Sequence, residues 1–237
     1  MNRALYLTGF LLIFLVGCID DDTGQVTNPE PGYAFYPAES GRFIIYQVDS
    51  IYHDQPVSNE PGIHDTVSFF LKEVIDGDFD DAIDEVSFEI KRFKKSTIEA
   101  DWQLTDVWFA KRSSRNVERV EENQRFVKMA FPILASAEWD GNALNDLDEW
   151  VYKYDSLFES RSIDSLLFDR TIRIDQRNFL TQVNDELAWE LYAEDVGLIY
   201  RYHKVLFTRP NYLNNRVATN IISGIEYRWK IINYGFE

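Results

Sequence analysis

The sequence predicts a mainly β protein of the β-rich α+β class, in which a curved antiparallel sheet or half-barrel carries one or two short helices. Three observations predict this class. Runs rich in β-branched and aromatic residues recur along the chain, several of them alternate with period two, and short polar turns join them. Parallel strands need long and usually helical crossovers, so short turns favour antiparallel pairing.

The first segment has the features of a bacterial secretory signal. Arg3 gives a basic start, and the apolar run that follows, to about Val16, is shorter than the roughly 20 residues of a transmembrane helix. Leu15-Val16-Gly17-Cys18 resembles the lipobox of bacterial lipoproteins. The resemblance implies that residues 1–17 are a signal peptide and that Cys18 is lipidated, for example with palmitate, which attaches the protein to the membrane. The alternative is an ordinary signal peptide with an incidental cysteine.

The next segment, residues 18–40, is expected to be a flexible acidic tether. It is rich in Asp, Asn, Pro and Gly and has no sustained apolar period, so it buries too little surface to fold alone. Residues 41–237 are expected to form one β-rich envelope domain. Cys18 is the only cysteine, so no disulfide within the chain is expected and packing must supply the stability.

The charge of the chain indicates which partners to expect. Loss of residues 1–17 removes one positive charge, Arg3, and changes the formal net charge from −16 to −17. Such an acidic protein repels phosphate backbones, so no nucleic-acid partner is expected. Asp20, Asp21 and Asp22 resemble the export signal of surface-displayed lipoproteins. An aspartate directly after the lipidated cysteine would favour retention in the inner membrane, but that position holds Ile19. The outer membrane is therefore predicted, with the cell surface favoured over the periplasmic face; the alternative is that the aspartates only begin a solvated linker.

Nine strand-like segments are predicted in the domain. In the first of them, Ile44, Tyr46 and Val48 share one face of an extended chain. Asp76-Gly77 is a favoured turn dipeptide and is expected to reverse the chain after the second segment. The predicted strand segments are residues 42–54, 65–75, 86–96, 102–113, 118–134, 148–160, 170–178, 197–209 and 222–237.

Residues 184–195 are the best helical candidate. Leu187 and Leu191 recur at helical spacing after Asn184, which is a plausible helix cap. A second short helix is expected near residues 144–150. Gly197 is then expected to be the turn residue where the longer helix ends and a strand begins.

An acidic stretch offers a weak candidate for a metal site. Asp76, Asp78 and Asp80 follow a D-x-D-x-D spacing, as in the calcium loop of an EF-hand. The sixth and twelfth positions hold Asp81 and Ser87 instead of glycine and glutamate, so a solvated hairpin turn is the favoured interpretation. A second acidic stretch, residues 139–149, lacks any recognised calcium spacing.

No catalytic residue and no cofactor is predicted. His53, His64 and His203 show no zinc spacing, although the first two flank a loop and would meet across a hairpin; surface histidines near a turn are the favoured interpretation. Serine-hydrolase elbows and phosphate-binding glycine loops are absent from the sequence. The 40 acidic residues leave a glycosidase-type carboxylate pair open.

Two stretches resemble uncharacterised bacterial outer-membrane and other envelope lipoproteins and secreted proteins. They are FPILASAEWDGN, residues 131–142, and ELYAEDVGLIYRYHKVLF, residues 190–207, which carry "FP…W.GN" and "YA..VGL" signatures. The resemblance implies a curved antiparallel sheet and brings no assigned activity.

The predicted function is that of a non-enzymatic envelope lipoprotein. It is expected to bind an apolar ligand or an envelope protein partner, with most of the six tryptophans filling the core and a minority lining a concave face. Two alternatives stay open: a surface protein that binds or cleaves glycans, and a structural accessory subunit of an outer-membrane complex.

Overall fold

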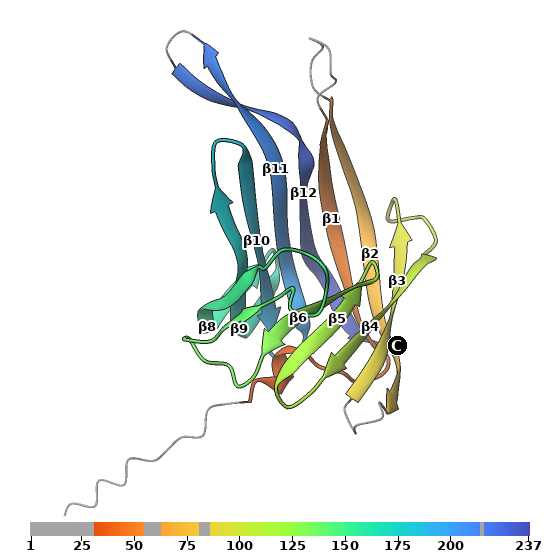
Figure 1. Cartoon of the computed structure of the whole chain (residues 1–237). Coiled ribbons are helices and arrows are strands. Elements are labelled where there is room, and N and C mark those ends of the chain that lie inside the picture. Colours follow the sequence, from red (N-terminus) through yellow and green to blue (C-terminus); the bar gives the residue numbers. More distant parts are fainter. Residues whose placement is uncertain (1–30, 55–62, 81–85, 214–215) are drawn as a thin grey trace, which may run out of the picture.

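Twelve antiparallel strands in one sheet make up the fold of the protein (Figure 1). The computed structural model describes residues 31–54, 63–80, 86–213 and 216–237. A single 3-10 turn, η1 (Tyr33–Phe35), precedes the strands. The strands are β1 (Arg42–Asp54), β2 (Ile63–Asp80), β3 (Val86–Lys95), β4 (Gln103–Arg112), β5 (Asn116–Glu121), β6 (Gln124–Ala130), β7 (Glu138–Asp140), β8 (Val151–Ile163), β9 (Leu166–Leu180), β10 (Asn184–Ala193), β11 (Gly197–Leu213) and β12 (Arg216–Phe236).

The sheet is nearly closed into a barrel. Its strand order is β6-β5-β4-β3-β2-β1-β12-β11-β10-β9-β8-β7, so the first and last strands of the chain pair in the middle of the sheet. The two edges, β6 and β7, meet where the Val127 amide donates to Gly141 O at 2.9 Å and Trp139 Nε1 donates to Val127 O at 2.9 Å. The predicted mainly β fold with antiparallel pairing is confirmed.

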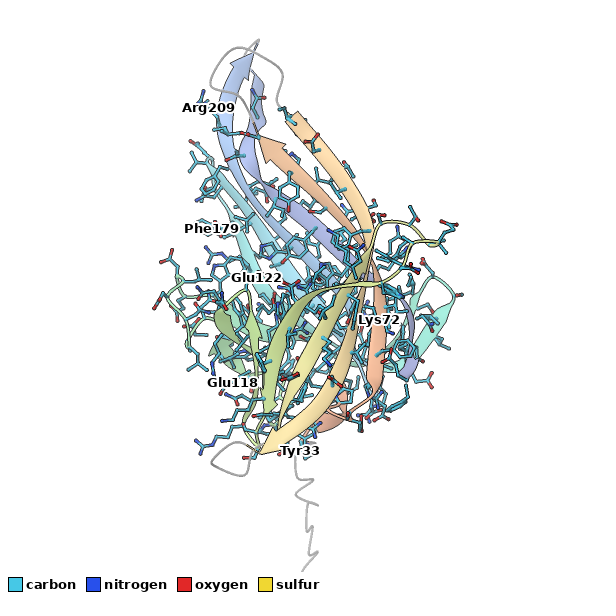
Figure 2. All side chains as sticks on the ribbon, turned by 90° about the vertical axis from the view of Figure 1, so that its right-hand side faces the viewer. Tyr33, Lys72, Glu118, Glu122, Phe179 and Arg209 are labelled. Carbon is cyan, nitrogen blue, oxygen red and sulfur yellow. The ribbon has the colours of Figure 1, made fainter. Side chains whose placement is uncertain are left out.

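One end of the barrel is filled by the residues that precede β1. Phe35 of η1 is completely buried and Tyr36 is 6% exposed, and both belong to the hydrophobic core. The folded part of the chain therefore begins before residue 41. Figures 1 and 2 show η1, marked by Tyr33, at one end of the molecule and the long β11–β12 hairpin, marked by Arg209, at the other.

The alternation predicted for the first strand is confirmed. Tyr46 and Val48 are buried and face the interior, where Tyr46 lies opposite Leu71 of β2 and Ile231 of β12. The Tyr46 hydroxyl donates to Leu198 O at 2.9 Å, which joins β1 to β11 across the interior.

The predicted helix at residues 184–195 is wrong. The segment is strand β10, which pairs with β9 on one side and β11 on the other. Leu187 and Leu191 are four residues apart, and this spacing places them on one face of a strand as well as of a helix. The chain reverses after β10, and Gly197, with φ 101°, starts the next strand, so Gly197 is a turn residue between two strands. Residues 144–150 contain turns and bends in place of the second expected helix.

Two other local predictions also need correction. The chain does not turn at Asp76-Gly77: β2 continues to Asp80, and Gly77, with φ 78°, lies at a bulge in its pairing with β3. The single strand predicted over residues 118–134 is the hairpin of β5 and β6. Its turn is formed by Glu122 and Asn123, which have φ values of 48° and 64°, as a type I′ turn requires.

No helix in the described part of the chain has the length and apolar character needed to cross a membrane.

Candidate functional site

The interior of the barrel contains charged side chains from six strands, here called the interior ion cluster. Every member is at most 8% exposed. The members are Glu73, Arg92, Arg119, Glu121, Lys128, Glu190 and Arg201. Because an unpaired charge is very costly to bury, each of these groups needs a partner of opposite charge.

Half of the cluster is organised around Glu73 of β2. Its Oε1 atom accepts from Arg119 Nη2 at 2.6 Å and from Arg92 Nε at 3.2 Å. The Arg92 guanidinium also lies 3.5 Å from the ring centroid of Trp108, a cation–π contact.

The other half is organised around Arg201 of β11. Its Nη1 atom donates to Glu121 Oε2 at 2.9 Å, and its Nε atom lies 3.3 Å from Glu190 Oε1. Lys128 Nζ donates to the same Glu190 oxygen at 2.6 Å, and the Tyr192 hydroxyl donates to Glu190 Oε2 at 2.7 Å.

The two halves form one chain of alternating charge. Arg119 Nε lies 3.3 Å from Glu121 Oε1, which joins them. The resulting order is Arg92, Glu73, Arg119, Glu121, Arg201, Glu190 and Lys128. The chain begins and ends on a cation, so four buried cations face three buried carboxylates.

Strand register explains why these charges meet. Glu73 lies directly opposite Arg92, and Glu190 lies directly opposite Arg201. Lys128 is the extra residue of a bulge between β5 and β6, where Val117 pairs with Met129 and Glu118 with Val127. Bulges redirect side chains, and this one accompanies an inward-facing lysine.

The cations keep the buried carboxylates ionised. Burial by itself would raise the pKa of Glu121, but the charges of Arg201, Lys128 and Arg119 outweigh burial and hold that pKa below its ordinary value of 4.5. The pKa of Glu190 is lowered in the same way: burial opposes the shift, and Lys128 and Arg201 cause it. Glu121 and Glu190 are therefore ionised at neutral pH.

A cavity opens beside the ion cluster, at the level of the β5–β6 turn marked by Glu122 in Figure 2. It has a volume of 430 Å³, and a neighbouring cavity of 290 Å³ shares Glu121, Glu122, Arg201 and Tyr227 with it. We call the larger one the mouth cavity. Its lining comprises Glu121, Glu122, Gln124, Phe126, Lys128, Asn142, Leu147, Asp148, Trp150, Tyr152, Gln176, Arg201, His203, Val205 and Tyr227.

Two buried donors in the lining lack a hydrogen bond. Gln176 of β9 is 3% exposed, and its buried Nε2 atom has no hydrogen-bond partner within the described part of the chain. Arg201 Nε is likewise buried without a hydrogen bond, although Glu190 lies within ion-pair distance of it. Buried donors are nearly always satisfied in folded proteins, so these two atoms indicate a position where an acceptor is expected.

A stack of rings forms one wall of the mouth cavity. His203 lies between Trp150, at a centroid distance of 5.8 Å, and Tyr227, at 4.8 Å, and both pairs are stacked. Burial lowers the pKa of His203 to about 4, and the charges of Arg201 and Lys128 contribute to the shift. The imidazole is therefore neutral at physiological pH.

The candidate metal residues Asp76, Asp78 and Asp80 all belong to strand β2. Asp76 is exposed and pairs with Lys91, and Asp78 and Asp80 belong to the same strand beyond the Gly77 bulge. Among the described residues there is no group of three or more side chains arranged to hold a metal ion. The predicted lipidation site, Cys18, lies outside the described residues.

His53 and His64 do meet across the β1–β2 hairpin, as their positions suggested. They lie directly opposite each other, with 2.8 Å between their Nδ1 atoms. Desolvation and the neighbouring His64 lower the pKa of His53. Tyr52 lines the smaller cavity, so His53 lies on the other face of the strand. Asp76 is twelve residues from His64 along β2, roughly 40 Å at about 3.3 Å per residue, so the pair is separate from the acidic stretch.

The ion cluster and the mouth cavity are the features that sequence reasoning missed. One signal was available: Arg92 follows Val86, Phe88 and Ile90 at period two, which places a cation on the apolar face of its strand. Other members of the cluster, such as Glu121 of β5 and Arg201 of β11, come from strands far apart in the chain, and only the nearly closed sheet brings them together.

Comparison with known proteins gives only distant structural similarity. No family model matches the sequence, and no curated protein matches it. One similar solved structure is a protein of Bacteroides fragilis NCTC 9343 described as exported and as having a YmcC-like fold. It is 10% identical, with a TM-score of 0.44, and the match covers 84% of this chain and 99% of that chain. Another is a protein of Parabacteroides distasonis ATCC 8503 described as a lipoprotein, which is 10% identical with a TM-score of 0.41, over 88% of this chain and 100% of that chain.

Proposed function

We propose that the protein is an outer-membrane lipoprotein, anchored through Cys18 and displayed at the cell surface, that binds a small organic ligand in the mouth cavity. The observation that carries the binding role is the 430 Å³ cavity with the buried, unpartnered Gln176 amide in its wall. Small-molecule sites typically measure about 300–1,000 Å³ and combine apolar walls with a few buried polar groups.

The composition of the cavity wall favours a largely apolar ligand body. Its lining includes the apolar and aromatic side chains of Phe126, Leu147, Trp150, Val205 and Tyr227. The ion cluster beneath provides a rigid floor, because every charge in it is held by at least one partner.

A glycan is a less favourable ligand for this cavity. Sugars stack on free aromatic faces, whereas Trp150 already stacks on His203 and lies 5.3 Å from the Arg177 guanidinium. Glu121 and Glu190, the buried carboxylates nearest the cavity, are both engaged by cations, so neither provides the protonated acid that glycoside hydrolysis needs.

Filling the mouth cavity should abolish ligand binding. Val205→Trp places an indole in the space beside Val205, so we expect the affinity for the neutral dye phenylnaphthylamine to fall about tenfold or more. The measurement is a fluorescence titration of the mature chain, residues 18–237, carrying Cys18→Ser. Val107→Trp adds the same side chain at a 40%-exposed position of β4 and should leave dye binding unchanged. Equal affinity of the Val205→Trp and unsubstituted proteins would contradict the proposed site.

The anchor is tested separately. In cells fed labelled palmitate, the full chain should incorporate label and Cys18→Ala should not, because the lipobox cysteine is the proposed acceptor. Cell fractionation should then find the variant released from the membrane. Incorporation of label by Cys18→Ala would contradict the proposed anchor. Protease treatment of intact cells tests the proposed location separately: a protein displayed at the cell surface should be degraded.

A further inference from the structure

The polar groups around the mouth cavity identify the chemistry of its ligand. Gln176 lines the mouth cavity, and its buried amide nitrogen has no hydrogen-bond partner among the described residues. Arg201 Nε is a second buried donor in the same wall. An acceptor placed between such donors gains hydrogen bonds without displacing any made within the protein.

The charges beneath the cavity favour an anionic acceptor. The interior ion cluster has one more cation than carboxylates, and the carboxylates that balance the excess, Asp106 and Glu122, are 37% and 76% exposed in their side chains. Water screens these outer charges more strongly than the buried ones. Among the buried charged groups, positive charge therefore exceeds negative charge by one, which favours an anionic ligand group.

The acidic groups of the lining do not oppose such a ligand. Glu121 is held by Arg201, and its other oxygen, which also lacks a hydrogen bond, lies 3.3 Å from Arg119 Nε and 3.7 Å from Lys128 Nζ. Glu122 is exposed at the rim, and Asp148 is exposed in the segment before β8. Gln176, in contrast, has neither an ion pair nor a hydrogen bond at its nitrogen.

We propose that the ligand of the mouth cavity is an organic carboxylate with an apolar body, whose carboxylate accepts hydrogen bonds from Gln176 Nε2 and Arg201 Nε while its body contacts the aromatic wall. This inference rests on the proposed binding function and adds the chemical class of the ligand. A carboxylate matches the site because its two oxygens can accept from two donors at once.

The test compares decanoate with its neutral ester, methyl decanoate, as competitors of bound phenylnaphthylamine on the mature chain carrying Cys18→Ser. Decanoate should displace the dye with an affinity about tenfold or more above that of the ester, because only the acid offers charge-assisted hydrogen bonds. Equal affinities would overturn the carboxylate assignment. If the dye binds but decanoate does not displace it, the assignment fails while the binding function stands; if neither dye nor decanoate binds, both fail.

Substitution of Gln176 locates the head group. Gln176→Glu replaces the donor by a carboxylate of the same shape and should weaken decanoate binding about tenfold or more, with little effect on the ester. Asn178→Asp makes the same change of charge at an exposed position two residues along β9 and should leave both affinities unchanged. Gln176→Met removes the donor without adding charge, and it replaces Gln176→Glu in this test if Gln176→Glu does not fold. Undiminished decanoate binding by the folded Gln176 variants would overturn the assignment.

Discussion

Replacing Glu190 by leucine should destabilise the protein by about 3–5 kcal/mol, the range found when one partner of a buried ion pair is removed. Glu190 is completely buried and accepts from Lys128 and Tyr192, with Arg201 beside it. Without it, Lys128 keeps only Glu121, at 3.7 Å. The free energy of unfolding is measured by urea denaturation at neutral pH.

A matched substitution on the same strand gives the control. Glu186 accepts from Arg177 at 2.6 Å, in a pair that is more exposed than the Glu190 contacts. Glu186→Leu should cost about 1 kcal/mol or less, because partly exposed ion pairs contribute little. Adding Lys128→Met to Glu190→Leu should recover part of the lost free energy of unfolding, because the buried cation that lost its partner is then removed. If both leucine substitutions cost the same, the interior ion cluster does not have the energetic role assigned to it.

The protein should lose about 3 kcal/mol of stability through His203 alone as the pH falls from 6.5 to about 4. The pKa of His203 is lowered to about 4 by burial and by Arg201 and Lys128, while Glu121 and Glu190 act in the opposite direction. Between pH 6.5 and about 4, His203 is therefore protonated in the unfolded chain and neutral in the folded chain. The stability due to the neutral ring is complete above pH 6.5 and is lost as the pH approaches 4.

His203→Phe isolates this contribution. Phenylalanine keeps a ring between Trp150 and Tyr227 but does not titrate, so the variant should show a smaller loss of stability between pH 6.5 and 4. The measurement is the difference in unfolding free energy between variant and unsubstituted protein across that range, which cancels the titration of the carboxylates. Parallel curves for His203→Phe and the unsubstituted protein would show that His203 is not responsible.

Most strands were predictable from the sequence because one face of each is apolar. The alternation around Tyr46 and Val48 is an example, and it gives the correct inner face. Prediction failed for β10, where the spacing predicts a helix and the structure has a strand. In β10 the inward side chains are Ala188, Glu190 and Tyr192, and a charge in the middle of the buried face hides the period-two pattern.

The candidate site was unpredictable for a related reason. A charged residue in a strand is expected to face solvent, so Arg119, Glu121 and Lys128 give no sign of burial on their own. Their burial depends on the pairing of β1 with β12, which converts two separate sets of strands into one barrel. Gln176 is an ordinary polar residue in the sequence, and only the coordinates show that its amide nitrogen has no partner.

The barrel is sealed at one end and open toward the other. Phe35 and Tyr36 close the end where the described chain begins, and the cavity that Tyr36 lines there measures only 50 Å³. Tyr52, near the end of β1, and Ile225, opposite it in β12, line the 290 Å³ cavity further along the barrel. The described chain begins at the closed end, so the proposed anchor at Cys18 would join the barrel on the side away from its open end. A ligand would then enter the barrel from the end that does not carry the attachment.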